Sequence, residues 1–337
     1  MTISPSDRVH GSLLGGALGD ALGWPVEFRR LDRIRDDYGP LGVTGLRAAD
    51  RPGDRAGDIT DDTQMTLFTV EGLLAGGTPA DLHRSYRHWL LTQRREGPGP
   101  QPASPLLAHA FLYARRAPGN ACLSGLEEHP EFVPPVATGQ VGPVNGHSKG
   151  CGTVMRSAPF GLLGLGPDAS FELAAQCAQL THGHPTGQLA AGAFAALVDR
   201  VAAGLPLPEA LAAAVETLER HPNAAETVEA LDRAVRIAAE GPPSAEAVER
   251  VGLGWIAEEC LAIAVYCALT TTDARSALLL AVNHSGDSDS TGAVCGNLVG
   301  ALYGAAALPA DWLAVVEGRA LITEMADALL TRAQPGA

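Results

Sequence analysis

The sequence has few basic and few aromatic residues. Aromatic side chains make up 5% of the 337 residues, and Lys149 is the only lysine, so arginine supplies every other permanently positive side chain. The 24 Lys and Arg stand against 38 Asp and Glu, which gives a formal net charge of −14. A chain this acidic is poorly suited to coat a phosphate backbone or an anionic membrane surface. We therefore expect neither direct binding to a nucleic-acid backbone nor membrane binding.

Long apolar runs and paired cysteine motifs are also missing. The apolar run from Leu261 to Leu269 is far shorter than the roughly 20 residues of a membrane span, and the N-terminus lacks a charged segment followed by a long apolar one. No CxxC pair occurs, which favours reduced, buried thiols over a zinc site or a disulfide framework. We expect a cytoplasmic protein that is a monomer. The six cysteines are Cys122, Cys151, Cys177, Cys260, Cys267 and Cys295.

Strand signals are weak as well. Alternating β-branched or aromatic runs are almost absent, whereas apolar residues recur every three or four positions along most of the chain. With 46% hydrophobic residues, the chain has enough material for a core. The pattern predicts an all-α fold, and one domain over 1–337, because no loop separates halves of different composition. We expect helices over 6–23, 60–76, 80–95, 105–116, 154–163, 169–179, 185–203, 208–220, 224–240, 256–269, 274–282, 291–306 and 311–332, with loops over 29–58, 96–105 and 130–150.

Two adjacent acids follow a threonine at one expected helix start. Thr60 precedes Asp61 and Asp62 in the stretch GDITDDTQM. Carboxylates are favoured at a helix N-terminus by its free N–H groups and by the helix dipole. This pair therefore has two interpretations, a helix start or a ligand set.

A second acidic stretch precedes another expected helix near the C-terminus. In HSGDSDSTG, Asp287 and Asp289 alternate with hydroxyl side chains, including Ser290. Such a loop offers the hard oxygen ligands that Mg²⁺, Mn²⁺ or Ca²⁺ prefer. Taken together, the two stretches could hold two divalent ions about 3.5–4 Å apart, whereas one pair alone would more easily hold a single ion.

Three further stretches carry chemistry-bearing residues. Gly15, Gly19 and Gly23 repeat every four positions and predict close helix–helix approach, with Asp20 and Glu27 as polar exceptions. A glycine-rich stretch over 145–156 contains the only lysine and could bind an anion at a helix start, although it lacks the spacing of an ATP-binding P-loop. The histidines of the THGHP stretch over 181–185 lack the HExxH spacing of zinc proteases.

The order of these motifs resembles one known family. GxxLGxAxGDALGxxxE, GxxTDDTxM, GxGxxMR, Thr-His and GDxDSTGAxxGN follow one another between about Val9 and Gly304. In this order they look like the ADP-ribosylglycohydrolase family. The resemblance implies a compact, single-domain helical fold with a binuclear Mg²⁺ or Mn²⁺ site in a central cleft.

The resemblance also implies roles for individual residues. Glu27 matches a glutamate beside the metals, and Asp20 matches an acid that we expect to support the site from behind. Cys151 stands where many members have Asn, and Ser290 where many have Thr. The implied metal ligands are Thr60, Asp61, Asp62, Asp287, Asp289 and Ser290, and the implied ADP-ribose contacts are Ser148, Lys149, Gly150, Cys151, Gly152 and His182.

The implied reaction is hydrolysis of the glycosidic bond between ADP-ribose and an acceptor. Divalent ions can fix the ribose through its hydroxyl groups and lower the pKa of water. Glu27 or Asp62 would accept the proton of the attacking water. The acceptor stays open among arginine, serine, O-acetyl-ADP-ribose, a nucleic-acid base and a small guanidine. Two other hypotheses are a catalytically silent ADP-ribose-binding or structural protein and a phosphohydrolase that releases AMP.

Overall fold

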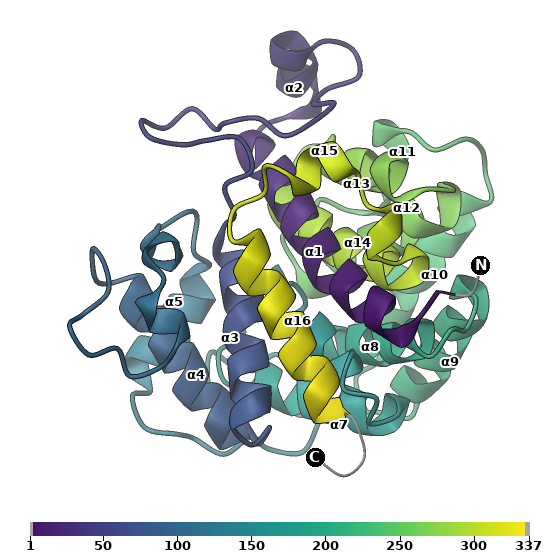
Figure 1. Cartoon of the computed structure of the whole chain (residues 1–337). Helices are drawn as coiled ribbons and strands as arrows, with labels where there is room; N and C mark the ends of the chain where they lie inside the picture. The colour runs from purple at the N-terminus through teal and green to yellow at the C-terminus, as the bar shows by residue number, and fades with distance from the viewer. Residues whose placement is uncertain (1–2, 334–337) are drawn as a thin grey trace.

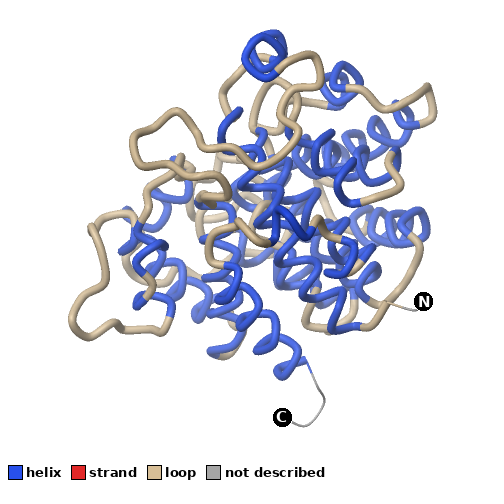
Figure 2. The backbone as a smooth tube through the Cα atoms, turned by 45° about the horizontal axis from the view of Figure 1, so that its top comes forward, coloured by secondary structure: helices blue, strands red, loops and turns tan. Residues whose placement is uncertain are grey.

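The computed structural model describes residues 3–333, and these residues form an all-α fold. Within them, the only pairing of extended backbone is an isolated bridge between Gly150 and Ile256, and Figure 2 accordingly shows helices and loops without a strand. This confirms the predicted fold class. The α-helices are α1 Pro5–Gly23, α2 Leu31–Tyr38, α3 Asp61–Ala75, α4 Pro79–Thr92, α5 Asn120–Glu128, α6 Ala158–Gly161, α7 Pro167–Ala178, α8 Pro185–Ala202, α9 Leu207–Glu219, α10 Ala225–Ala238, α11 Ala245–Val251, α12 Ala257–Thr270, α13 Ala274–Val282, α14 Ser288–Tyr303, α15 Ala310–Leu313 and α16 Arg319–Ala333.

Two helices far apart in the sequence, α1 and α14, form an antiparallel pair. A Cβ atom placed on Gly19 would lie 1.8 Å from the carbonyl oxygen of Gly292, and one on Gly15 would lie 2.3 Å from that of Gly296. The predicted role of the glycine repeat in close helix approach is confirmed. One consequence is that the C-terminal end of α1 lies against the N-terminal end of α14, where a Cβ on Gly23 would touch the backbone of Ser288.

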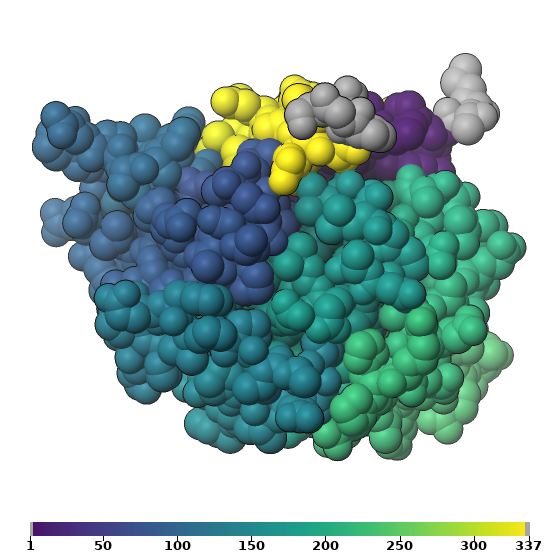
Figure 3. All heavy atoms as spheres, turned by 90° about the horizontal axis from the view of Figure 1, so that it is seen from below, coloured from purple at the N-terminus to yellow at the C-terminus, as the bar shows by residue number. Residues whose placement is uncertain are grey.

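Other helices surround this pair. Helix α16 packs between α1 and α3 (Figures 1 and 3). Helices α8 and α12 are buried along nearly their whole length. Helix α2 extends from the top of the molecule in Figure 1, with Leu31 and Ile34 as its buried residues. No helix among the described residues is long and apolar enough to cross a membrane.

Three expected helices are wrong or interrupted. Residues 105–116 form only two short 3₁₀ turns, Leu106–Ala108 and Ala110–Tyr113. The helix expected over 154–163 is reduced to α6, because Pro159 lacks the N–H that a helix interior needs. The helix expected over 311–332 is split into α15 and α16. Gly318 between them has a φ of +72°, and the N–H of Glu317 donates to the carbonyl of Gly57 instead of continuing a helix.

Three helices were not expected. Helix α2 lies in the segment predicted as a loop because of its charge, and the N–H of Leu31 at its start donates to the hydroxyl of Ser285. Helices α5 and α11 are short, with nine and seven residues. Tertiary contacts with distant residues stabilise such segments, and local sequence carries little signal of those contacts.

Candidate active site

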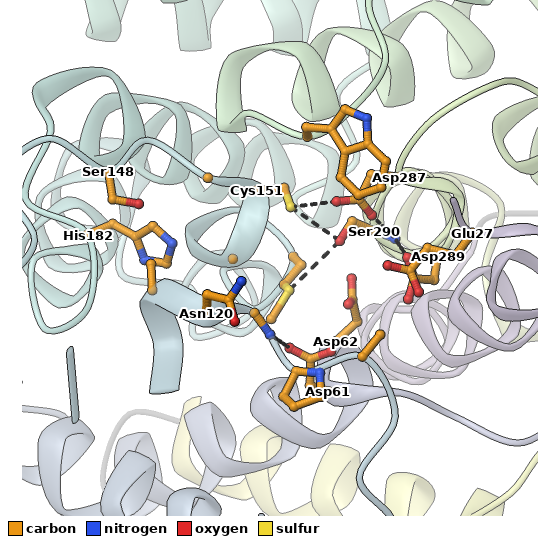
Figure 4. A pocket seen from close by; sticks show the side chains of 18 of the residues that line it. Glu27, Asp61, Asp62, Asn120, Ser148, Cys151, His182, Asp287, Asp289 and Ser290 are labelled. Carbon is orange, nitrogen blue, oxygen red and sulfur yellow. Dashed lines mark hydrogen bonds between the residues drawn. The ribbon is translucent and has the colours of Figure 1, made fainter. Parts of the chain in front are cut away.

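A cavity of about 510 Å³ lies between the segment that follows α1, the N-terminal ends of α3 and α14, and the glycine-rich stretch over 145–156. Figure 4 shows the acidic side chains on one side of this cavity and Ser148 and His182 on the other. The segment 117–121 closes a further wall. Of the residues predicted from the sequence, the cavity lining includes Glu27, Asp61, Asp62, Ser148, Gly150, Cys151, Gly152, His182, Asp287, Asp289 and Ser290.

The acids reach the cavity from two helix N-termini. Thr60 caps α3, where its hydroxyl oxygen accepts the N–H of Asp62, and Asp61 and Asp62 form the first turn. Asp287 caps α14 by accepting the N–H of Ser290. The predicted helix starts are confirmed, and both motifs also line the cavity. Thr60 is buried beneath the lining and is not part of it.

The carboxylates are buried close to one another, and no lysine or arginine is found among the described residues that line the cavity. Burial and neighbouring carboxylates raise the pKa values of Asp61, Asp62 and Asp289 well above the ordinary range. Burial, followed by the charges of Asp287 and Asp61, raises the pKa of Glu27 to about 9. Like charges crowded in a low dielectric repel one another unless protons or cations neutralise them.

These side chains fit a divalent cation. Carboxylate oxygens of Glu27, Asp287 and Asp289 lie within 4.8 Å of one another. Glu27 Oε2 and Asp62 Oδ1 are buried and have no hydrogen-bond donor among the described residues. Carboxylate oxygens are the ligands that Mg²⁺ and Mn²⁺ prefer, and two of these oxygens accept no hydrogen bond from residues 3–333 that would compete with a cation.

Asp20 lies behind the acids, outside the cavity lining. Its carboxylate accepts the N–H of Thr60 at 3.0 Å, the N–H of Thr63 at 3.1 Å and the hydroxyl of Thr63. Burial raises its pKa to about 6, although these hydrogen bonds oppose the rise. Asp20 therefore holds the start of α3 from beneath.

The glycine-rich stretch forms the opposite wall without its lysine. Lys149 Nζ contacts Glu226 at 2.9 Å and Glu258 at 2.5 Å, and Lys149 is not part of the cavity lining. Backbone bonds fix the stretch, since the N–H of Cys151 donates to the carbonyl of Trp255 at 3.2 Å. Cys151 Sγ lies 2.8 Å from Asp287 Oδ2. The stretch and the acid cluster are therefore in direct contact.

His182 faces the cavity as a neutral imidazole. Its Nδ1 lies 2.7 Å from the hydroxyl oxygen of Thr181. Burial, together with the nearby guanidinium of Arg156, lowers the pKa of His182 to about 3. His182 can therefore offer a hydrogen bond to a ligand but no positive charge.

The sequence did not identify two parts of the lining. Phe28 and Trp255 stack with ring centroids 5.2 Å apart at the cavity, and both rings are partly exposed. Phe28 also has a φ of +64°, which is rare for a bulky residue. The N–H of Gly119 donates to Asp61 Oδ2 at 3.0 Å. These contacts join distant segments, and no local spacing marks them.

Known proteins resemble this chain over nearly its whole length. A family model described as ADP-ribosylglycohydrolase matches residues 1–337. The chain is 28% identical to ADP-ribosyl-dinitrogen reductase glycohydrolase of Rhodospirillum rubrum over 98% of both proteins. It is 26% identical to ADP-ribosylarginine hydrolase Tri1 of Pseudomonas putida, over 98% of this chain and 81% of that one. A solved structure described as an ADP-ribosylglycohydrolase-related protein complex aligns with a TM-score of 0.72 and 28% identity, over 98% of this chain and 99% of the other.

Proposed function

The chain belongs to the ADP-ribosylglycohydrolase family, and on that premise we propose that it is a metal-dependent hydrolase that cleaves the glycosidic bond between ADP-ribose and an acceptor. The observation that carries this proposal is the cluster of buried acids from both ends of the chain beside one glycine-rich wall. The ligands would be Thr60, Asp61, Asp62, Asp287, Asp289 and Ser290. Bound there, Mg²⁺ or Mn²⁺ would neutralise the carboxylates, orient the ribose hydroxyls and make water more acidic.

The chain's own acids would handle the proton. Glu27 is our first candidate for the general base, because its Oε2 is buried at the edge of the acid cluster and finds no donor in the described part of the chain. Burial and neighbouring charges raise its pKa. Bound cations would remove the repulsion between the carboxylates and lower the pKa of Glu27, so that it would be ionised and able to accept a proton from water. Asp62 is the second candidate.

The opposite wall would bind the diphosphate through backbone and hydroxyl groups. Because the Lys149 ammonium is occupied by two glutamates, we assign Lys149 to holding the loop and not to direct phosphate contact. Gly152 has no room for a side chain, since a Cβ there would lie 2.8 Å from Cys122 Sγ and 3.0 Å from the His182 ring. Free N–H groups in such a glycine-rich turn attract anions. Ser148 and neutral His182 would add hydrogen bonds.

The aromatic pair is our candidate for the acceptor side. Phe28 directly follows Glu27 and stacks on Trp255, so the pair lies next to the acids that would surround the bond to be cleaved. An aromatic face beside carboxylates suits a planar cation such as a guanidinium. The name of the Pseudomonas putida relative refers to arginine. Arginine-linked ADP-ribose is therefore the first acceptor to test.

Release of free ADP-ribose tests the proposal. Arginine-, serine- and nucleotide-linked conjugates and O-acetyl-ADP-ribose would be incubated with Mg²⁺ or Mn²⁺, and in parallel with EDTA. Asp61→Ala and Asp289→Ala remove proposed ligands, and Asp232→Ala, at an exposed position on α10, is the matched control. We expect metal-dependent release from at least one conjugate, lost in both ligand variants and kept in the control. Binding of ADP-ribose without release from any conjugate would favour a silent binding protein.

A further inference from the structure

The buried guanidinium of Arg116 connects two walls of the candidate active site. Its Nη1 donates to the carbonyl of Ile59 at 2.6 Å, directly before Thr60. Three residues after Arg116, the N–H of Gly119 donates to Asp61 Oδ2. Arg116 therefore binds the backbone just upstream of the TDD motif, and the turn that follows Arg116 binds the motif itself.

Two buried carboxylates complete this arrangement. Arg116 contacts Glu317 Oε2 at 2.6 Å and Asp58 Oδ2 at 3.1 Å. Glu317 in turn accepts the N–H of Ile59 at 3.3 Å, and its own N–H donates to the carbonyl of Gly57 at 2.9 Å. All these bonds converge on residues 57–59, which immediately precede the proposed ligands.

The charges in this network balance. Two acids, Asp58 and Glu317, face two arginines, because Arg55 also reaches Glu317 at 3.1 Å. Arg55 is largely exposed, whereas Arg116 is buried. A planar guanidinium can donate to a carbonyl and two carboxylates at once, which a lysine ammonium does with poorer geometry.

We propose that Arg116 is a positioning residue for the metal-binding motif Thr60-Asp61-Asp62, acting through Glu317 and the Ile59 backbone. This inference rests on the proposed function, because it takes that motif as a metal site. Groups that orient metal ligands from outside typically change metal affinity by 10- to 100-fold when removed. The side-chain partners of Arg116, which are Asp58, Ile59 and Glu317, all lie outside the cavity lining.

An arginine at the end of the α1–α14 pair away from the acids provides the matched control. Arg8 also donates to two backbone carbonyls, those of Ala301 at 2.7 Å and Leu302 at 3.1 Å. It lies near the start of α1, about 18 Å along the helix axis from Asp20. Loss of Arg8 removes comparable hydrogen bonds between distant segments without touching the residues before Thr60.

Mn²⁺ binding to the full-length protein, measured by electron paramagnetic resonance, separates these roles without requiring turnover. The variants are Arg116→Met, Arg116→Lys, Glu317→Gln and the control Arg8→Met, with circular dichroism to verify folding. We expect Arg116→Met to weaken Mn²⁺ binding by at least about tenfold. Arg116→Lys and Glu317→Gln should show smaller losses, and Arg8→Met should stay within about twofold of the wild type.

Each outcome has one meaning. Wild-type Mn²⁺ affinity in every folded Arg116 and Glu317 variant would overturn the positioning role and leave the proposed function intact. An equal loss in Arg8→Met would also overturn it, since general destabilisation would then explain the effect. If Arg116→Met does not fold, Arg116→Lys and Glu317→Gln decide the question. Absence of Mn²⁺ binding to the wild type would instead overturn the metal site and the proposed function with it.

Discussion

A carboxylate oxygen of Glu27 lies within 4.8 Å of a carboxylate oxygen of Asp289, although the two residues belong to opposite ends of the sequence. The cause is the antiparallel contact between α1 and α14, in which glycines face each other. Side chains at those positions would separate the helix ends that carry the acids. Assembly of the candidate site therefore depends on a backbone contact some distance from it.

Substitution of Gly19 tests this dependence. Gly19→Ala places a methyl group 1.8 Å from the Gly292 carbonyl oxygen, so α1 and α14 must move apart. We expect a loss of about 3 kcal/mol or more in the free energy of unfolding, measured in urea. Gly241→Ala, where a Cβ meets no atom within 4 Å, should change it by less than about 0.5 kcal/mol. Similar values for the two variants would contradict the account.

The helix pair was predictable because its signal is local. The repeat of Gly15, Gly19 and Gly23 indicates close packing without revealing the partner helix. The breaks were less visible. Pro159 marks the start of α6 in the sequence, but the break between α15 and α16 includes the bond from the Glu317 N–H to the Gly57 carbonyl, which joins segments far apart in the chain. Long-range contacts of this kind override local helix preference.

Asp62→Asn is expected to stabilise the metal-free protein. Asp62 Oδ1 is buried without a donor among residues 3–333, and burial and neighbouring acids raise the pKa of its carboxyl. A neutral side chain of the same shape removes that repulsion. We expect a gain of about 1–2 kcal/mol in EDTA at neutral pH, together with loss of Mn²⁺ binding. A destabilised variant would show that the acids do not repel one another in this way.

Asp20→Asn should have the opposite effect on stability. The Asp20 carboxylate accepts hydrogen bonds from the N–H groups of Thr60 and Thr63. The NH₂ group of an asparagine is itself a hydrogen-bond donor, so it cannot accept from these N–H groups. We expect a loss of about 2–3 kcal/mol in the same unfolding measurement. An unchanged free energy of unfolding would mean that these hydrogen bonds contribute little to the start of α3.

The stabilisation by divalent metal should grow with pH. The pKa of Glu27 is raised to about 9, and those of Asp61, Asp62 and Asp289 are raised as well. The folded, metal-free state thus keeps protons that the unfolded state releases above about pH 4.5, so its stability falls as the pH rises towards about 9. Metal displaces these protons.

Thermal melts measure this linkage. We expect excess Mn²⁺ to raise the Tm more at about pH 8.5 than at about pH 5.5, and the Tm in EDTA to fall between the same two values. Mg²⁺ should act in the same direction, and Ala replacements of Asp61 and Asp289 should reduce the gain. A metal-induced shift that is independent of pH would contradict protonation of the acid cluster.

Trp255→Ala tests the assignment of the acceptor side. Its side chain stacks on Phe28, whereas the bond to Cys151 uses the Trp255 backbone carbonyl and survives the substitution. We expect the KM for an arginine-linked conjugate to rise by about tenfold, because a tenfold change corresponds to the binding free energy of one cation–π contact. Inhibition by free ADP-ribose should stay within about twofold. Equal losses for both ligands would place the aromatic pair on the ADP-ribose side instead.

Much of the candidate site could be predicted from sequence motifs. Acids in the first turn of a helix keep their position at the helix start wherever that helix packs in the fold. The placement of Lys149 did not follow, since its partners Glu226 and Glu258 come from α10 and α12. The same holds for Phe28, Trp255 and Gly119. The expectations of one domain, a monomer and a cytoplasmic location stay predictions, and size-exclusion chromatography tests the second of them.

The most direct test of the central claim is the mass of the nucleotide product formed from arginine-linked ADP-ribose in the presence of Mn²⁺. Hydrolysis of the glycosidic bond yields intact ADP-ribose and unmodified arginine. We predict that ADP-ribose is the product, that EDTA abolishes its formation and that Asp289→Ala does the same. Formation of AMP instead would mean that the diphosphate is cut, and would contradict the glycohydrolase account.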